Sequence, residues 1–322
     1  MAKKIKKVDC QTHLIPQKII EKMKNMRASD PLDQMFNTRE NRFYDLEVKL
    51  KDMDEFGVDI QVLSCPIPAS IDANESKELM RFINDEIADA VRRYPQRFTG
   101  LTSVDLRDVK GAIEEVKRGR EKLGLKGVVV LSNVEGKGLD DPEFIPFWEE
   151  MANLDLPVFL HPFNNPVTLS WVSDHEKKAF LIPALLFMFD TSMAIIRLIF
   201  SGLYDKFPSL RIVDPHIGGI IPYILPRLMK EYTGEGAQGL MKGLTMTPGD
   251  YFKKFTYVDT VSLNVPALNC AYEILGPSKM LFASDYPFWD MGAATDTLEK
   301  SKIPKKEKVE IYSRGIDFLG LV

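Results

Sequence analysis

The chain has 322 residues, of which 45% are hydrophobic and 27% charged, and its formal net charge is −4 at pH 7. This composition is typical of a globular protein and excludes disordered, collagen-like and coiled-coil chains. Because acidic and basic residues nearly balance, the sequence predicts no basic surface for nucleic acid. We therefore expect a folded protein with no nucleic-acid partner.

Three features of the sequence indicate the cellular compartment of the protein. The basic residues 3–7 are not followed by the apolar run of about 7–15 residues that a signal peptide has. The most apolar segment, 181–200, is interrupted by Pro183, Asp190 and Arg197, which favours a buried helix over a membrane span. The three cysteines lack the spacing of disulfide frameworks and thiolate zinc sites. The predictions are a cytoplasmic protein and no membrane partner.

Short runs rich in β-branched and aromatic residues recur along the chain and predict eight strands. Each run is mostly apolar, as strands covered by helices should be. In chain order the predicted strands are 7–11, 59–64, 98–104, 127–131, 157–160, 211–213, 255–259 and 280–284.

Helical periodicity lies between these strands. Segment 78–91 has an apolar stripe, 108–123 has one behind the candidate N-cap Asp108, and 46–57 ends at the candidate helix-terminal Gly57. Alternation repeated about eight times predicts an α/β protein, a single (β/α)₈ TIM barrel domain over residues 1–322. The irregular segments 26–45 and 163–178 are expected to form extended loops over the C-terminal mouth of the barrel, where such folds keep their active sites.

Three of the four histidines lie at the end of a predicted strand. His13 follows the first strand, His161 the fifth and His216 the sixth, and Asp285 follows the eighth. Because the carboxyl ends of barrel strands meet at one mouth, we expect these side chains to lie together. Imidazoles and a carboxylate are ligands typical of a single divalent metal ion with an open coordination position.

Other polar residues are weaker candidates for the site. Gln11 lies two residues before His13, so an extended backbone directs both side chains towards the barrel interior. Asp9 is expected to brace the first strand, Cys65 to be a buried apolar residue, and His175, in a charged stretch, to lie outside the site.

The chain resembles the amidohydrolase superfamily, whose fold is a (β/α)₈ barrel, and within it the decarboxylase-type branch related to aminocarboxymuconate-semialdehyde decarboxylase. The segment from Asp9 to His13 is similar to the D-x-H-x-H motif of the first strand. The longest similar stretch is 199–213, followed by His216-Ile217-Gly218-Gly219, and 281–288 resembles the eighth-strand signature. The resemblance covers most of the chain.

This resemblance implies a role for each strand-end residue. His13, His161 and Asp285 would bind one divalent metal ion, and His216 together with Asp285 would carry out acid–base catalysis. Gln11 stands where the family usually has His or Glu, and we predict it to be a weak metal ligand; a hydrogen-bonding role or no role are the alternatives. Zinc is the predicted metal, and the oxygen donor of an amide shifts the preference modestly towards manganese or magnesium.

The loops at the mouth carry the residues predicted to bind substrate. Arg39 lies close to the position where the semialdehyde decarboxylases have an arginine for a substrate carboxylate. Phe163, Phe288 and Trp289 are predicted to stack on a planar substrate.

The leading hypothesis is a metal-dependent, non-oxidative decarboxylase, a carboxy-lyase, that acts on a small planar carboxylic acid, aromatic or dienoic. One alternative is a hydrolase of an amide or lactone, or a hydratase, that uses the same residues. A second alternative is a barrel that has lost its metal and binds a ligand without turnover. The apolar excess of segment 181–200 also predicts a homodimer or a higher homo-oligomer.

Overall fold

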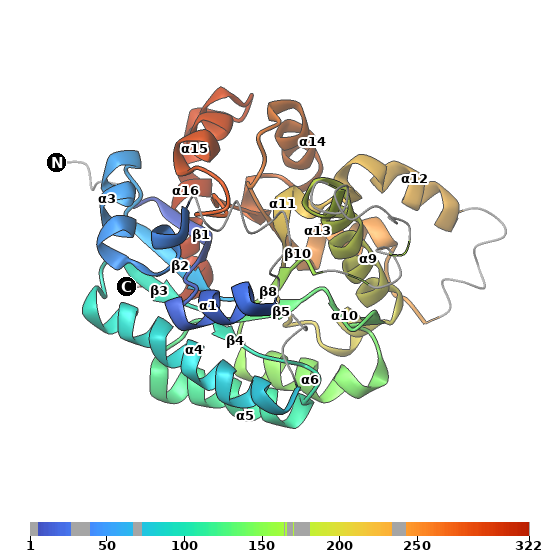
Figure 1. Cartoon of the computed structure of the whole chain (residues 1–322). Helices are drawn as coiled ribbons and strands as arrows, with labels where there is room; N and C mark the ends of the chain where they lie inside the picture. Colours follow the sequence, from blue (N-terminus) through green and yellow to red (C-terminus); the bar gives the residue numbers. More distant parts are fainter. Residues whose placement is uncertain are drawn as a thin grey trace.

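In the computed structural model, the described residues are 6–26, 39–66, 73–163, 165, 170, 181–233 and 243–321. Within them, eight parallel barrel strands alternate with helices (Figure 1). The strands are β1 (Val8–His13), β2 (Ile60–Ser64), β3 (Phe98–Gly100) with its continuation β4 (Thr102–Ser103), β5 (Val128–Leu131), β8 (Val158–His161), β9 (Ile212–Asp214), β10 (Thr256–Asp259) and β11 (Met280–Leu281). Each predicted strand is found, although the third is split at Leu101 and the eighth is shorter than expected.

These strands form two parallel sheets that join into one barrel. The orders are β1-β2-β3 and β11-β10-β9-β8-β5-β4, and β3 and β4 are neighbouring parts of one extended segment. At the other edges of the two sheets, β1 meets β11 and the segment after it: the amide of Cys10 donates to the carbonyl of Phe282 at 2.8 Å, and Thr12 pairs with Tyr286. These contacts close the barrel, so the predicted α/β TIM barrel is confirmed.

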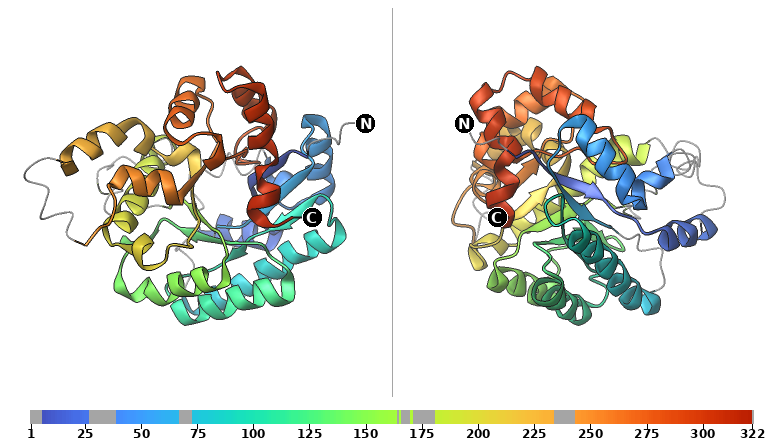
Figure 2. Two further views of the ribbon diagram at one scale, coloured as in Figure 1. Left: turned by 180° about the vertical axis from the view of Figure 1, so that it is seen from behind. Right: turned by 90° about the vertical axis from the view of Figure 1, so that its left-hand side faces the viewer.

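Helices surround the barrel in all three ribbon views (Figures 1 and 2). Gly57 has a left-handed backbone directly after the helix Leu46–Phe56. Asp108 caps the helix Val109–Arg118 by accepting from the amide of Gly111 at 2.9 Å. Both predicted helix ends are therefore confirmed. The helices are α1 (Gln17–Met26), α3 (Leu46–Phe56), α4 (Ala73–Arg93), α5 (Val109–Arg118) with η1 (Gly119–Leu123), η2 (Pro142–Phe144), α6 (Ile145–Leu154), η3 (Ile182–Leu186), α9 (Phe187–Phe200), α10 (Leu203–Lys206), α11 (Pro215–Gly218), α12 (Ile221–Thr233), α13 (Pro248–Phe255), α14 (Val265–Leu275), η4 (Pro277–Lys279), α15 (Met291–Lys300) and α16 (Lys305–Leu319). A short antiparallel pair, β6 (Asn133–Val134) and β7 (Lys137–Gly138), follows β5.

Alternate side chains of the strands pack in two layers. Those facing outward pack against the helices, and those facing inward meet across the barrel axis. Because inward-facing residues of opposite strands belong to one contact cluster, the barrel is a packed core and not a pore. The inner cluster contains Val8, Cys10, Ile60, Val62, Leu101, Val129, Phe159, Val213 and Leu281, together with Phe318 and Leu319 of α16.

A bulge in β1 decides which of its side chains enter the barrel. Val8 pairs with Ile60 and His13 pairs with Ser64, so six residues of β1 oppose five of β2. An extra residue on one strand reverses the alternation beyond it. Val8 and Cys10 therefore lie in the inner core, and His13 also turns inward, at the mouth.

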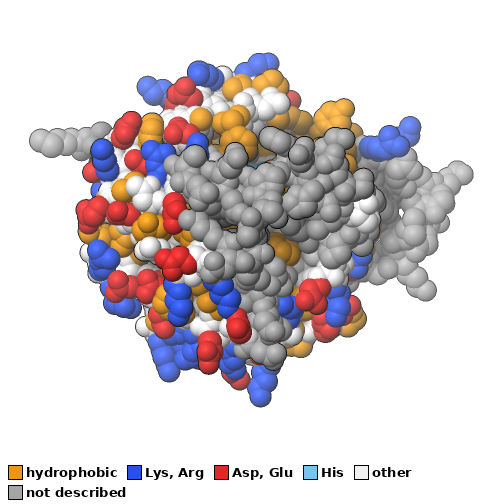
Figure 3. All heavy atoms as spheres, viewed as in Figure 1, with side chains coloured by type: hydrophobic (Ala, Val, Ile, Leu, Met, Phe, Trp, Pro, Cys, Tyr) orange, Lys and Arg blue, Asp and Glu red, His pale blue; other side chains and the backbone are white. Residues whose placement is uncertain are grey.

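The apolar segment after β8 is a helix of the outer layer, as expected. Ile182–Phe200, which combines η3 and α9, is long and apolar enough to cross a membrane, but half of it is buried in the fold, as in a helix that packs on a protein core. One face of this helix remains exposed, since Leu181, Leu185, Phe189 and Met193 are 36–55% accessible. On the face drawn in Figure 3, acidic and basic side chains are interspersed.

Candidate active site

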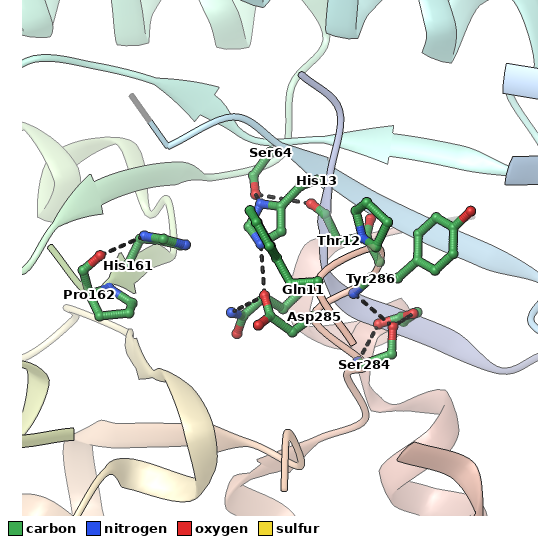
Figure 4. A network of polar contacts seen from close by, with 12 residues as sticks. Gln11, Thr12, His13, Ser64, His161, Pro162, Ser284, Asp285 and Tyr286 are labelled. Carbon is green, nitrogen blue, oxygen red and sulfur yellow. Dashed lines mark hydrogen bonds and ion pairs between the residues drawn. The ribbon is translucent and has the colours of Figure 1, made fainter. Parts of the chain in front are cut away.

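The site forms where the end of β1 meets the segment that follows β11. The Nε2 atom of His13 lies 2.8 Å from Oδ1 of Asp285, and the side-chain amide of Gln11 donates to the same oxygen at 3.2 Å (Figure 4). Two residues predicted from the first strand therefore meet the one predicted from the eighth. Asp285 has a positive φ of 61°, which turns its carboxylate back over the end of β1.

The environment of His13 fixes its ring. The side chain is completely buried, and Nδ1 lies 3.3 Å from the hydroxyl of Ser64 at the end of β2. The ammonium of Lys49, also fully buried, donates to the backbone carbonyl of His13 at 2.7 Å. The contact of Nδ1 with Ser64 leaves Nε2 as the nitrogen that faces Asp285, and the contact with Lys49 holds the backbone of His13.

His161 completes the imidazole pair. Its ring is nearly perpendicular to that of His13 with the centroids 5.3 Å apart, and it extends from Pro162 towards the site (Figure 4). Nδ1 lies 2.8 Å from the carbonyl of Pro162, an acceptor, so Nδ1 carries the proton and Nε2 keeps its lone pair. Burial, reinforced by the neighbouring His13, lowers the pKa of His161 to about 3, which keeps the ring neutral.

His216 enters from a different backbone feature, a left-handed turn after β9. Its φ and ψ are 54° and 56°, a conformation uncommon for residues other than glycine. Burial lowers the pKa of His216, partly opposed by the attraction of Asp285. The neutral ring of His216 lines the same cavity as His161 and Asp285.

The carboxylates of the site differ in charge. Burial alone would raise the pKa of Asp285, but the hydrogen bond and charge of His13 lower it below its ordinary value. Burial raises the pKa of Asp9 to about 7. Asp9 accepts from the amide of Ser284 at 2.9 Å and from the hydroxyl of that serine, so it braces β1 against the strand end that carries Asp285.

A cavity of about 370 Å³ opens beside these groups. Phe163, Phe288 and Trp289 line it, as expected for residues predicted to contact substrate. Arg39 is not among the lining residues; its guanidinium donates to the carbonyls of Pro287 and Phe288 at 2.8 and 3.0 Å. The remaining described walls are mostly apolar, contributed by Ile15, Pro66, Leu131, Pro162, Ile182, Pro183, Ala184, Phe187, Met188, Ile217, Gly219, Val261, Ser262, Leu263, Ser284, Asp290 and Ala294, with the ends of His161, His216 and Asp285.

The donor chemistry fits a divalent metal ion. His161 gives its ring proton to a backbone carbonyl, the arrangement that orients metal-binding histidines, and Asp285 is held as a carboxylate. Among the described side chains, however, no group of three His, Cys, Asp or Glu residues is arranged closely enough to hold a metal ion. The short contact between His13 and Asp285 joins two of the predicted ligands directly to each other.

Sequence reasoning missed several polar neighbours of the site. Ser64 also ends a strand, and the rule that selected the histidines would have found it. Lys49 lies on the buried side of α3, between Leu46 and Met53, where a charged residue is a signal of a buried polar contact. Much of segments 26–45 and 163–178, with His175, lies outside the described residues.

The sequence model of the amidohydrolase family matches residues 8–312, nearly the whole barrel. The chain belongs to the amidohydrolase family. Among curated amidohydrolases it is 28% identical to 2-amino-3-carboxymuconate-6-semialdehyde decarboxylase of Dictyostelium discoideum, over 98% of this chain and 92% of that protein. It is 30% identical to gamma-resorcylate decarboxylase of Rhizobium sp., over 84% and 86% of the two chains.

Solved structures support the same family assignment. The 5-carboxyvanillate decarboxylase of Novosphingobium aromaticivorans, complexed with manganese and 4-hydroxy-3-methoxy-5-nitrobenzoic acid, superposes with a TM-score of 0.87 and 26% identity, over 99% of this chain and 97% of that one. The predicted family, its decarboxylase-type branch and the carboxy-lyase class are thereby confirmed. The roles of the individual site residues stay predictions.

Proposed function

We propose that this chain is a metal-dependent, non-oxidative decarboxylase of a small aromatic carboxylic acid. The observation that carries the proposal is the convergence of His161, His216 and Asp285 on one end of an apolar cavity, with His13 bonded to Asp285 behind them. Relatives named for decarboxylation of gamma-resorcylate and 5-carboxyvanillate support an aromatic substrate. A dienoic acid is the alternative, supported by the semialdehyde decarboxylase.

His13, His161 and Asp285 are the residues that would hold the metal, with Gln11 as a weak additional ligand. When bound, a divalent ion would supply positive charge that fixes the carboxylate and a neighbouring oxygen of the substrate. We propose zinc because two of the three main ligands are imidazoles. Manganese, bound in the carboxyvanillate decarboxylase, and magnesium are the alternatives that oxygen donors permit.

The chain's own residues supply orientation and proton transfer. Phe163, Phe288 and Trp289 would contact a planar ring and exclude water from it. As the bond to the carboxylate breaks, the electron pair stays on the ring carbon, which must take up a proton. His216 and Asp285 line the cavity and are the groups proposed to relay that proton: one of them first takes up a proton from solvent and then passes it to the ring carbon.

The test is a panel of hydroxylated benzoates, aminomuconate-type dienoic acids, lactones and amides, assayed in deuterium oxide and separately in ¹⁸O-labelled water. A decarboxylase releases carbon dioxide and places one deuterium on the carbon that lost it. Incorporation of solvent oxygen without carbon dioxide would establish a hydrolase instead. Ligand binding without turnover, in protein that retains no metal, would support the non-catalytic barrel.

We also propose that the protein is a homodimer or a higher homo-oligomer. Leu181, Leu185, Phe189 and Met193 recur every four residues and form an exposed apolar stripe on the helix whose other face lines the cavity. Exposed stripes of this kind are typical of subunit interfaces.

A cytoplasmic location is proposed because all three cysteines are free thiols.

A further inference from the structure

The turn that carries His216 is held in an unfavourable backbone conformation. Four consecutive residues, His216 to Gly219, have φ values of 54°, 57°, 83° and 58°. Glycine adopts positive φ freely, but Ile217 is β-branched, and for such a residue this region is a genuine outlier. Strained backbone persists only where surrounding contacts enforce it, and it is concentrated at functional sites.

On one side the turn is fixed by α9. The hydroxyl of Ser192 accepts from the amide of Ile220 at 2.9 Å and donates to the carbonyl of Met188 at 2.7 Å. The approach is so close that a Cβ on Gly219 would lie 2.3 Å from that hydroxyl. On this side the hydrogen bonds therefore hold the end of the turn, at Gly219 and Ile220.

On the other side the strained residues meet Asp259, the last residue of β10. Its Oδ1 accepts from the amide of Ile217 at 3.2 Å and from the amide of Val261 at 2.9 Å, and the amide of His216 also interacts with this carboxyl. Asp259 is only 1% exposed and is not among the cavity-lining residues. Its acceptor thus lies against the turn, behind the cavity-lining residues Ile217 and Val261.

We propose that Asp259 is a positioning residue for His216. Its Oδ1 atom stabilises the left-handed turn by accepting from the amide of Ile217, and the turn directs the His216 ring into the cavity. The inference rests on the proposed function, in which His216 transfers a proton. The competing explanation is that Asp259 merely caps the loop at Val261, in which case the conformation of Ile217 would not depend on it.

The test compares two replacements of Asp259. Asp259→Asn keeps an oxygen acceptor in place of Oδ1, whereas Asp259→Leu has a similar size and no acceptor. We expect Asp259→Leu to lower kcat by about 10²-fold, the loss typical of a reacting group displaced by about 1 Å. Asp259→Asn should stay within about threefold of wild type.

Ile217→Gly separates positioning from loop capping. Glycine adopts the left-handed turn without an acceptor, so adding Ile217→Gly to Asp259→Leu should restore kcat by about tenfold or more relative to Asp259→Leu. The same change added to wild type or Asp259→Asn should give no gain. A leucine variant that keeps wild-type kcat, or that Ile217→Gly does not rescue, would overturn the proposal.

A readout independent of turnover separates this proposal from the proposed function. In ¹⁵N-histidine-labelled protein, the His216 imidazole signals, assigned with His216→Ala, should shift in Asp259→Leu and return in the double variant. An unchanged signal contradicts the positioning role even if decarboxylation is established, and a shift with return supports it even if no substrate reacts. If Asp259→Leu does not fold, Asp259→Ala, which also lacks the acceptor, replaces it in the same comparison.

Discussion

Nε2 of His13 and Oδ1 of Asp285 lie 2.8 Å apart although 272 residues separate them in the chain. They are neighbours because β1 and the segment after β11 are the first and last elements of the barrel, and its closure brings their ends together. The centre of the site is therefore assembled only when the barrel closes.

Replacing His161 by alanine should abolish metal retention with little loss of fold. Its free Nε2 is one of three predicted ligands, and removing one ligand from such a set weakens binding severely. Elemental analysis of protein purified without chelators measures the metal content. His216→Ala is the matched control, because it removes a neighbouring imidazole and should keep the metal. Equal metal content in wild type and His161→Ala would exclude His161 as a ligand.

Gln11→His should tighten metal binding by about tenfold or more, because an imidazole nitrogen is a better donor to a transition metal than an amide oxygen. In the structure, the Gln11 amide instead donates to Asp285. Competition with a chromophoric chelator measures the change. An unchanged affinity would mean that position 11 does not reach the ion.

His216→Ala should lower turnover by about 10²–10⁴-fold while the metal content stays at the wild-type level, since one positioned acid–base group typically contributes this much. The comparison requires a substrate found with the isotope panel. Loss of metal together with activity would instead make His216 a ligand.

Asp190→Ala should lower the free energy of unfolding by about 1–3 kcal/mol and raise KM. Asp190 is a buried acceptor for Ser132, Asn133 and Asn165, and the Ser132 hydroxyl accepts from the amide of the cavity residue Phe163 at 3.0 Å. Its removal takes away a buried acceptor shared by these donors and loosens the chain at Phe163.

The control for Asp190 lies on the same helix. Arg197→Ala breaks a surface ion pair with Asp140, which should cost about 0–1 kcal/mol and leave KM unchanged. Chemical denaturation and steady-state kinetics measure both variants. If Asp190→Ala resembles the control, the buried network does not support the cavity wall.

Wild-type protein should be at least a dimer at micromolar concentration, and Leu185→Asp with Phe189→Asp should dissociate it. Both side chains belong to the exposed stripe of η3 and α9, and a buried unpaired carboxylate at an interface is costly. Light scattering measures the mass. Arg197→Glu, a change of charge on the same helix, should leave the mass unaltered; a monomeric wild type would contradict the prediction.

The sequence by itself determined the barrel and the candidate site residues. Strand and helix periodicity are local properties, and they predicted eight strands and the helix ends at Gly57 and Asp108. Because all parallel strands of a barrel end at the same mouth, strand-end position alone was enough to group His161, His216 and Asp285 around one cavity.

The tertiary structure decided how these groups face one another. Strict alternation predicted an inward His13, but it places Cys10 on the opposite face of β1; the bulge in β1 allows both residues to face inward. Arg39 contacts loop carbonyls, and Asp259 supports the turn of His216 from a neighbouring strand. Such contacts join residues far apart in the chain, so they depend on strand register and barrel closure, which local periodicity does not specify.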